Sequence, residues 1–341
     1  MNRYYTLFIA TLALCIAACQ SPTPADPDVI KTIGTIERLD PAFDALVPAG
    51  AQIEVLTEGH DWTEGPVWIP GGDYVLYSDI PPNSVFKWKA GEGKSLYLKP
   101  SGFSGGVDRK GEPGSNGLLL DQEGNLILCQ HGDRRLAMMD ADLDAPAPEY
   151  LSIADKWEGK RFNSPNDAVM HSSGDIYFTD PPYGLEKGAD DPLREIPFQG
   201  VYRVDNDGNV QLLFQLMTRP NGIAFSPDEK TLYVANSDPA LAIWMAFDVN
   251  EDGTLSNDRV FFDATNKVGP ENKGLPDGLK VDDAGNVWAT GPGGVLVFSP
   301  QGKHLGTLRT GEATSNCAFG NNGQYLYATA DMYLVRVRLK N

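Results

Sequence analysis

The sequence predicts an all-β fold, a six-bladed β-propeller made of four-stranded antiparallel blades. A pattern of one small polar pair and two short strands recurs six times from residue 64 onward, and no helical periodicity of useful length interrupts it. The repeats start 39 to 56 residues apart. Four strands in about 40–50 residues are typical of a propeller blade.

Each repeat begins with the polar pair, continues as an apolar strand, turns, and returns as a strand rich in β-branched and aromatic residues. The six pairs begin at Glu64, Asn116, Asn166, Asn221, Asp277 and Asn316. Two further short strands follow in most repeats, as at 84–89 and 95–98. Residues 51–57 (AQIEVLT) precede the first repeat, and we expect them to close the ring as the outer strand of the last blade.

Composition limits the class of function. The 341 residues carry a formal charge of −18, whereas a nucleic-acid-binding protein needs a basic surface against the phosphate backbone. Hydrophobic residues make up 41% of the chain and aromatic residues 10%, which is ordinary for a globular protein. We therefore expect a folded protein that does not bind nucleic acid.

The N-terminus is predicted to be an export signal. Arg3 precedes an apolar stretch at 7–18, which has the length of a signal-peptide core and is too short for a membrane span. Residues 16–19 (IAAC) resemble the lipobox of bacterial lipoproteins, in which the cysteine is lipidated and becomes the first mature residue. The resemblance implies lipidation of Cys19, and the alternative is ordinary secretion with an incidental cysteine.

These features divide the chain into three parts. We expect a signal peptide at 1–18, a Pro-rich tether at 19–32 and a single propeller domain at 33–341. The lipid would hold an exported protein at the periplasmic face of a membrane without spanning it. Gln20 after the cysteine resembles the sorting pattern for the outer membrane. We expect a monomer.

The repeat also predicts where functional residues gather. The innermost strand of each blade runs along the central channel, so the six polar pairs should surround one mouth of that channel. The second strand returns to the same end, which would bring His131 and Asp180 to the rim. The long segment 181–199 is expected to lie over this mouth.

Four side chains of this ring supply oxygen atoms suited to a metal. Glu64 and Asp277 are carboxylates, and Asn166 and Asn221 offer amide oxygens. An all-oxygen set of charge −2 favours Ca²⁺, with Mg²⁺ or Mn²⁺ as alternatives and Zn²⁺ less suited because the set lacks His and Cys. One such pair alone would indicate only a turn, but six in register indicate a shared axis. Open positions on the ion favour a catalytic over a structural role.

Longer motifs make a family resemblance specific. They are WTEGPVW (62–68), NGLLLDQEGNLILCQHGDRR (116–135), NSPNDAV (163–169), FTDPPYG (178–184), RPNGIAFSPDEKTLYVANS (219–237) and LPDGLKVDDAGNVWAT (275–290). The sequence resembles the senescence-marker-protein/gluconolactonase/luciferin-regenerating-enzyme family of six-bladed propellers, most of all its bacterial gluconolactonase branch. That family hydrolyses lactones, typically aldonolactones, to hydroxy acids, which implies a small-molecule lactone as substrate.

The resemblance also implies roles for individual residues. The divalent metal would be bound by Glu64, Asn221 and Asp277, whereas Asn166 would bind the metal or contact substrate. Some family members have an arginine for sugar contacts two residues before that asparagine. Ser164 stands there in this chain, so the identity of the lactone stays open.

Candidate catalytic residues follow. The family's general base corresponds to Asp277, but coordination to a cation depresses the basicity of a carboxylate. Asp180 is the alternative, because it should reach the rim without being a first-choice ligand. Asn116 and Asn166 are expected to donate hydrogen bonds to substrate. His131 is expected to contact substrate or act as a base, with a structural hydrogen bond as an equal alternative.

Two other functions remain open from the sequence. A calcium-dependent phosphotriesterase would use nearly the same ligands, and a binding propeller would hold a structural calcium beside a recognition surface. Cys129 and Cys317 lie in or beside apolar strands, and we expect both to be free, buried thiols.

Overall fold

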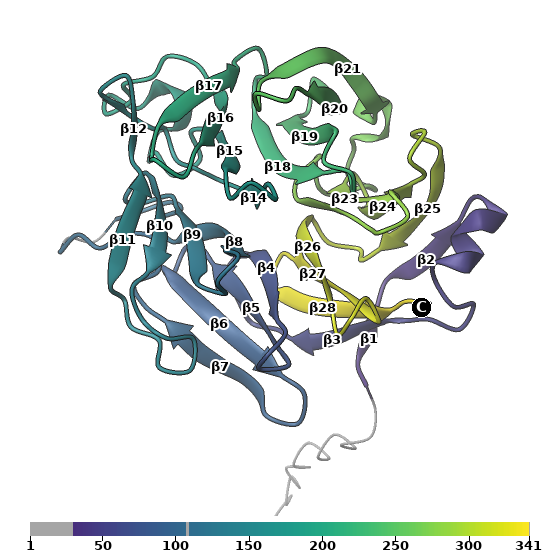
Figure 1. The fold of residues 1–341 in the computed structure, drawn as a ribbon. Coiled ribbons are helices and arrows are strands. Elements are labelled where there is room, and N and C mark those ends of the chain that lie inside the picture. Colours follow the sequence, from purple (N-terminus) through teal and green to yellow (C-terminus); the bar gives the residue numbers. More distant parts are fainter. Residues whose placement is uncertain (1–29, 107–108, 341) are drawn as a thin grey trace, which may run out of the picture. The chain divides into compact units, whose positions relative to one another are not determined.

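A computed structural model of the protein describes residues 30–106 and 109–340, and Figure 1 shows small sheets arranged around a common centre. Six antiparallel sheets have four or five strands each, and their inner strands contact one another in order around the ring. The predicted six-bladed propeller is therefore confirmed. Three short 3₁₀ turns, η1 (Pro41–Ala45), η2 (Gly188–Asp190) and η3 (Thr265–Lys267), are the helical segments of the described ranges.

In every blade the strands of one repeat follow the order of the chain from the channel outward, and the N-terminal strands are added outside the last two blades. The first blade consists of β4 (Thr63–Ile69), β5 (Tyr74–Asp79), β6 (Ser84–Lys89) and β7 (Gly93–Leu98). The second consists of β8 (Ser115–Leu120), β9 (Leu126–Gln130), β10 (Arg135–Met139) and β11 (Tyr150–Ala154). The third consists of β14 (Ala168–Met170), β15 (Ile176–Asp180), β16 (Gly200–Val204) and β17 (Val210–Phe214). A two-stranded ribbon, β12 (Lys156–Trp157) and β13 (Lys160–Arg161), connects the second and third blades in the chain.

The remaining blades repeat the same plan. They contain β18 (Pro220–Phe225), β19 (Thr231–Asp238), β20 (Leu241–Val249) and β21 (Leu255–Asp263), then β22 (Leu279–Val281), β23 (Val287–Gly291), β24 (Gly294–Phe298) and β25 (His304–Arg309), and finally β26 (Thr314–Gly320), β27 (Tyr325–Ala330) and β28 (Tyr333–Arg338).

The N-terminal segment closes the ring. β3 (Ile53–Thr57) pairs antiparallel with β28, which confirms the predicted outer strand of the last blade. Two strands that the sequence did not predict extend this closure. β1 (Thr32–Ile33) pairs with β3, whereas β2 (Thr35–Arg38) pairs with β25 of the fifth blade. The segment therefore ties the last two blades together.

Gly34 permits the chain to pass from β1 to β2. Its φ is +64°, in the left-handed region, and a Cβ at this position would lie only 1.8 Å from the carbonyl oxygen of Arg309. Glycine adopts this backbone conformation without steric cost, and no other residue fits so close to the neighbouring strand.

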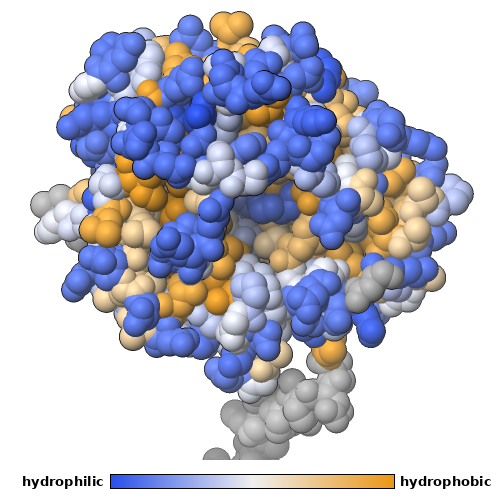
Figure 2. All heavy atoms as spheres, viewed as in Figure 1, coloured by the Kyte–Doolittle hydropathy of each residue, from blue (hydrophilic) through white to orange (hydrophobic). Residues whose placement is uncertain are grey.

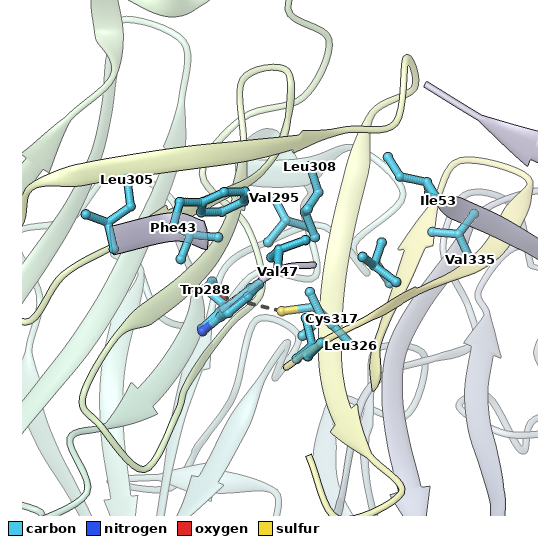
Figure 3. Close-up of a cluster of buried hydrophobic side chains, with 14 residues drawn as sticks. Phe43, Val47, Ile53, Trp288, Val295, Leu305, Leu308, Cys317, Leu326 and Val335 are labelled. Atoms are coloured by element: carbon cyan, nitrogen blue, oxygen red, sulfur yellow. Dashed lines mark hydrogen bonds between the residues drawn. The ribbon is translucent and has the colours of Figure 1, made fainter. Parts of the chain in front are cut away.

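A hydrophobic cluster fills the space beneath this closure (Figure 3). Phe43 and Val47 come from the N-terminal segment and pack with Trp288 of the fifth blade and Cys317 of the sixth. All four side chains are at most 1% exposed. Cys317 donates its thiol to the Trp288 carbonyl at 3.4 Å. Cys317 and Cys129 are free and buried, as predicted.

The predicted signal peptide at 1–18, the predicted lipidation site Cys19 and the predicted tether up to residue 29 lie outside the described residues. Within the described ranges, no helix is both long enough and apolar enough to cross a membrane.

Candidate functional site

The polar pairs pack directly against one another around the channel. Glycine is the second residue in four of the six pairs, and the packing explains its use. A Cβ on Gly65 would lie 2.1 Å from the Asn116 carbonyl oxygen, and a Cβ on Gly222 would lie 2.2 Å from that of Asp277. Each pair therefore rests on the backbone of the next blade, and residues far apart in the chain meet at one mouth.

Hydroxyl groups fix neighbouring blades to each other at this level. Thr179 Oγ1 donates to the Asn221 carbonyl at 2.7 Å, and Ser78 Oγ donates to the Asn116 carbonyl at 2.8 Å. Ser315 Oγ donates to the Thr63 carbonyl at 2.7 Å, which joins the sixth blade to the first. These buried bonds use backbone carbonyls of the ring, so they hold neighbouring blades together without occupying the side chains of Glu64, Asn116 or Asn221.

Glu64 and Asp277 interact electrostatically. The pKa of the Glu64 carboxyl is raised to about 8, chiefly by burial and to a smaller extent by the carboxylates of Asp167 and Glu112, while a hydrogen bond from the Gly65 amide acts against them. Burial also raises the pKa of Asp277 well above its ordinary value, and Glu64 is the next largest cause. Carboxylates that destabilise each other in this way are stabilised by a cation between them.

Three oxygen atoms of the polar pairs have no hydrogen-bond partner among residues 30–106 and 109–340. They are Oδ1 of Asn116, Asn166 and Asp277, and each exposes less than 1 Å². A buried polar atom without a partner costs about 1–3 kcal/mol, which coordination to a cation would relieve. Since carboxylate and amide oxygens are the ligands that Ca²⁺ and Mg²⁺ prefer, the residues present fit a hard divalent cation.

Asn221 completes the predicted set. It is 4% exposed and stands in β18, and its neighbour Gly222 contacts the Asp277 backbone. Two members of the predicted set, Asn166 and Asn221, are amides. Only Glu64 and Asp277 therefore belong to the residue types His, Cys, Asp and Glu that most often bind metals. No group of three or more of these four types that could hold a metal occurs in residues 30–106 and 109–340.

Asp180, the alternative general base, is occupied by the backbone. It is fully buried, and its two carboxylate oxygens accept the amides of Asn163 at 2.8 Å and Ser164 at 2.7 Å. Asp79 accepts the amides of Asp61 and Trp62 at the same place in the first blade. Burial raises the pKa of Asp180 to about 7. Asp180 therefore anchors the loop before the inner strand through these two hydrogen bonds.

His131 lies beneath the mouth, fully buried, rather than in open contact with the channel. Its Nε2 is 3.4 Å from Asn166 Nδ2, and its Nδ1 is 3.3 Å from a carboxylate oxygen of Glu112. The second contact is within ion-pair distance, but its angle leaves Nδ1 without a hydrogen bond. Of the roles left open for His131, the geometry favours a hydrogen-bonding one.

Sequence reasoning missed two acidic residues of the site. Asp167 Oδ2 accepts a hydrogen bond from Asn316 Nδ2 at 3.3 Å, which joins the third blade to the opposite, sixth blade across the channel. Its place as the second residue of a polar pair, where glycine is usual, was a usable signal. Glu112 lies in the loop before β8, and no motif marked it.

The segment 181–199 is fastened next to the site, in keeping with the prediction that it lies over the mouth. Ser164 Oγ donates to the Pro181 carbonyl at 2.6 Å and accepts the Gly184 amide at 2.9 Å. Ser164 therefore holds the turn that carries Tyr183. Burial raises the pKa of Tyr183, and the negative charge of the Asp277 carboxylate acts in the same direction.

A cavity of about 440 Å³ opens beside Asp277. Its lining includes Trp62, Ser237, Leu275 and Thr314 from the first, fourth, fifth and sixth blades. Figure 2 shows the surface hollowed near the centre, with hydrophilic residues at depth. A volume of this size accommodates a small molecule.

Comparison with known proteins identifies the family. Residues 62–331 match the model of the SMP-30/gluconolactonase/LRE-like region. The chain belongs to this family. It is 38% identical over 316 residues to a gluconolactonase of Zymomonas mobilis, an alignment that covers 91% of this chain and 87% of the relative.

Solved structures of the SMP-30/gluconolactonase family agree with this result. A gluconolactonase of Xanthomonas campestris is 31% identical with a TM-score of 0.78, and the match covers 93% of this chain and 99% of that one. A calcium-binding regucalcin of Agrobacterium tumefaciens is 21% identical with a TM-score of 0.65, covers 84% of this chain and 94% of its own, and shares the fold.

Proposed function

We propose that this protein is a metal-dependent lactonase that opens the ring of a sugar-derived lactone to give the hydroxy acid. The gluconolactonases of two bacteria are similar to it over most of their length. The observation that carries the proposal is that Oδ1 of Asn116, Asn166 and Asp277, which belong to polar pairs around one channel, are buried without hydrogen-bond partners in the described part of the chain.

Glu64, Asn166, Asn221 and Asp277 would hold the metal. We propose Ca²⁺, because the set is all oxygen and because a regucalcin of this fold is calcium-binding, with Mg²⁺, Mn²⁺ or Zn²⁺ as the alternatives to test. When bound, such an ion supplies a Lewis acid that polarises the lactone carbonyl and stabilises the developing oxyanion.

The remaining steps belong to side chains of this protein. Asp277 accepts a proton from the attacking water, whose oxygen bonds to the carbonyl carbon. The ring C–O bond then breaks, and its oxygen takes that proton back from Asp277 to become the hydroxyl of the product. Asn116 and Asn166 orient the substrate by hydrogen bonds, and Trp62 forms part of the wall of the cavity beside Asp277.

A pH-stat assay on a panel of lactones tests this function. We expect acid release that stops on addition of a chelator and returns when Ca²⁺ is restored. Hydrolysis that a chelator does not affect would contradict the metal mechanism. Hydrolysis of phosphotriesters in place of lactones would support the phosphotriesterase, and no hydrolysis of either class would leave a binding propeller.

We further propose that the protein acts at the periplasmic face of the outer membrane as a monomer attached through lipidated Cys19. The support is the lipobox-like segment 16–19 and the following Gln20. Replacing Cys19 by alanine should move the protein from the membrane fraction to the soluble fraction. Retention of the Cys19→Ala protein in washed membranes would contradict lipid attachment, and light scattering would report the oligomeric state.

A further inference from the structure

We propose that Glu112 and His131 are positioning residues that hold the Asn166 side-chain amide with its oxygen toward the cation. This inference deepens the proposed function, because it rests on a metal bound at the channel mouth. Neither residue needs to touch the metal. Their effect is transmitted through two consecutive polar contacts, from Glu112 to His131 and from His131 to Asn166.

The imidazole of His131 is fixed in place by its surroundings. It is 0% exposed, and its backbone amide donates to the Gly114 carbonyl at 3.2 Å. A Cβ on Gly184 would lie 2.6 Å from the His131 Cβ, so the turn at Gly184 packs directly against His131. The ring therefore presents Nδ1 and Nε2 to fixed neighbours.

The two neighbours decide which nitrogen carries the proton. Glu112 Oε2, 3.3 Å from Nδ1, is a carboxylate oxygen and can only accept. The contact is within ion-pair distance, and the Glu112 side chain is 37% exposed. In the neutral ring one nitrogen donates and the other accepts. Nδ1 therefore carries the hydrogen, and Nε2 is left as an acceptor.

An accepting Nε2 selects one orientation of the Asn166 amide. The amino group Nδ2 lies 3.4 Å from Nε2 and donates to it. Oδ1 is the other branch of the same amide, so it then points away from His131, and it is buried without a hydrogen-bond partner among residues 30–106 and 109–340. The flipped amide would direct N–H groups at the cation. Glu112 thus sets the orientation of an oxygen that it does not contact.

Calcium affinity of the purified full chain, measured by calorimetry, tests the inference without relying on catalysis. His131→Leu should weaken Ca²⁺ binding by about 10–100-fold, the usual effect of losing a partner of a metal ligand. His131→Gln should weaken Ca²⁺ binding by less than this, because the glutamine amide can accept a hydrogen bond from Asn166 and donate one to Glu112. Equal loss in both variants would overturn the inference.

Glu112 provides a second comparison, which decides the matter if the His131→Leu protein does not fold. Glu112→Gln keeps an acceptor oxygen near His131 Nδ1 and removes the charge. Glu112→Asp keeps the charge, but its shorter side chain places the acceptor oxygens farther from Nδ1. Positioning predicts the weaker Ca²⁺ binding for Glu112→Asp. The opposite order would mean that Glu112 acts only by charge and would overturn the inference. Glu123→Gln, at an exposed turn, is the control for net charge and should bind as wild type does.

The two proposals fail in different ways. Wild type should bind Ca²⁺, and Asp277→Asn should abolish that binding. If either result fails, the metal-dependent lactonase is contradicted, and the positioning role with it. If wild type binds Ca²⁺ and hydrolyses lactones while His131→Leu binds equally tightly, only the positioning role is overturned.

Discussion

At the scale of single residues, the two candidate bases differ in how their oxygens are used. Asp180 gives both oxygens to backbone amides, whereas Asp277 Oδ1 is buried without a partner. Asp277→Asn should lower kcat by at least about 10²-fold, the usual range for a general base, and leave the fold intact. Undiminished turnover by a folded Asp277→Asn enzyme would refute its catalytic role.

Asp180→Asn is the matched substitution, with the opposite expected result. The new amino group would face a backbone N–H of Asn163 or Ser164, so one buried donor loses its acceptor. We expect the free energy of unfolding to fall by about 1–3 kcal/mol, measured by urea denaturation. At a temperature where the variant is folded, kcat should change far less than in Asp277→Asn. A large loss of kcat without loss of stability would restore Asp180 as a base.

The repeat allowed the ring residues to be predicted, because each polar pair occupies the same place in its blade. Glu64, Asn166 and Asp277 could be placed together on that ground alone. Glu112 could not, since it lies in a connecting loop that no other repeat shares. The burial of His131 was also beyond the sequence, because it depends on packing against Gly184, which is distant in the chain.

At the scale of an element, β18 depends on close contact with the next inner strand. Gly222 has no room for a side chain, because a Cβ would lie 2.2 Å from the Asp277 carbonyl oxygen. Gly222→Ala should destabilise the protein by about 1–3 kcal/mol through overpacking and should displace Asp277 from the site. Gly50→Ala has open space and serves as the control. Equal urea midpoints and equal activity for the two variants would contradict this packing.

The start of β25 should make stability depend on pH. Burial lowers the pKa of His304 below its ordinary value of 6.5, with Lys267 acting in the same direction. The unfolded chain therefore takes up this proton first as pH falls below about 6.5, so the contribution of His304 to the free energy of unfolding should decrease there. The buried carboxyls of Glu64 and Asp180, whose pKa values are raised, contribute with the opposite sign, so the test is the difference between wild type and His304→Gln in urea denaturation at several pH values. A difference in the free energy of unfolding that does not change with pH would exclude this role of His304.

At the scale of the whole molecule, periodicity predicted six blades, because the polar pair and its strands recur six times. It also predicted the closure by residues 51–57, because this strand precedes the first repeat and the last blade needs an outer strand. The strands β1 and β2 were not predictable in the same way. They span two and four residues, and β2 pairs with a strand that lies more than 250 residues further along the chain. Such short strands exist because the last two blades offer them unpaired edges, which only the folded ring creates.

This closure should be the part of the ring most sensitive to loss of Phe43. The Phe43 ring is fully buried between the last two blades, so Phe43→Ala should cost about 3–5 kcal/mol. Phe178→Ala removes an equally buried ring from the cluster of the second and third blades and is the matched control.

Hydrogen exchange should distinguish the two variants. Phe43→Ala should expose the amides of β2, β3 and β28 at lower free energy than those of β15, and Phe178→Ala should do the reverse. Uniform loss of protection in both would show that the ring opens only as one cooperative unit.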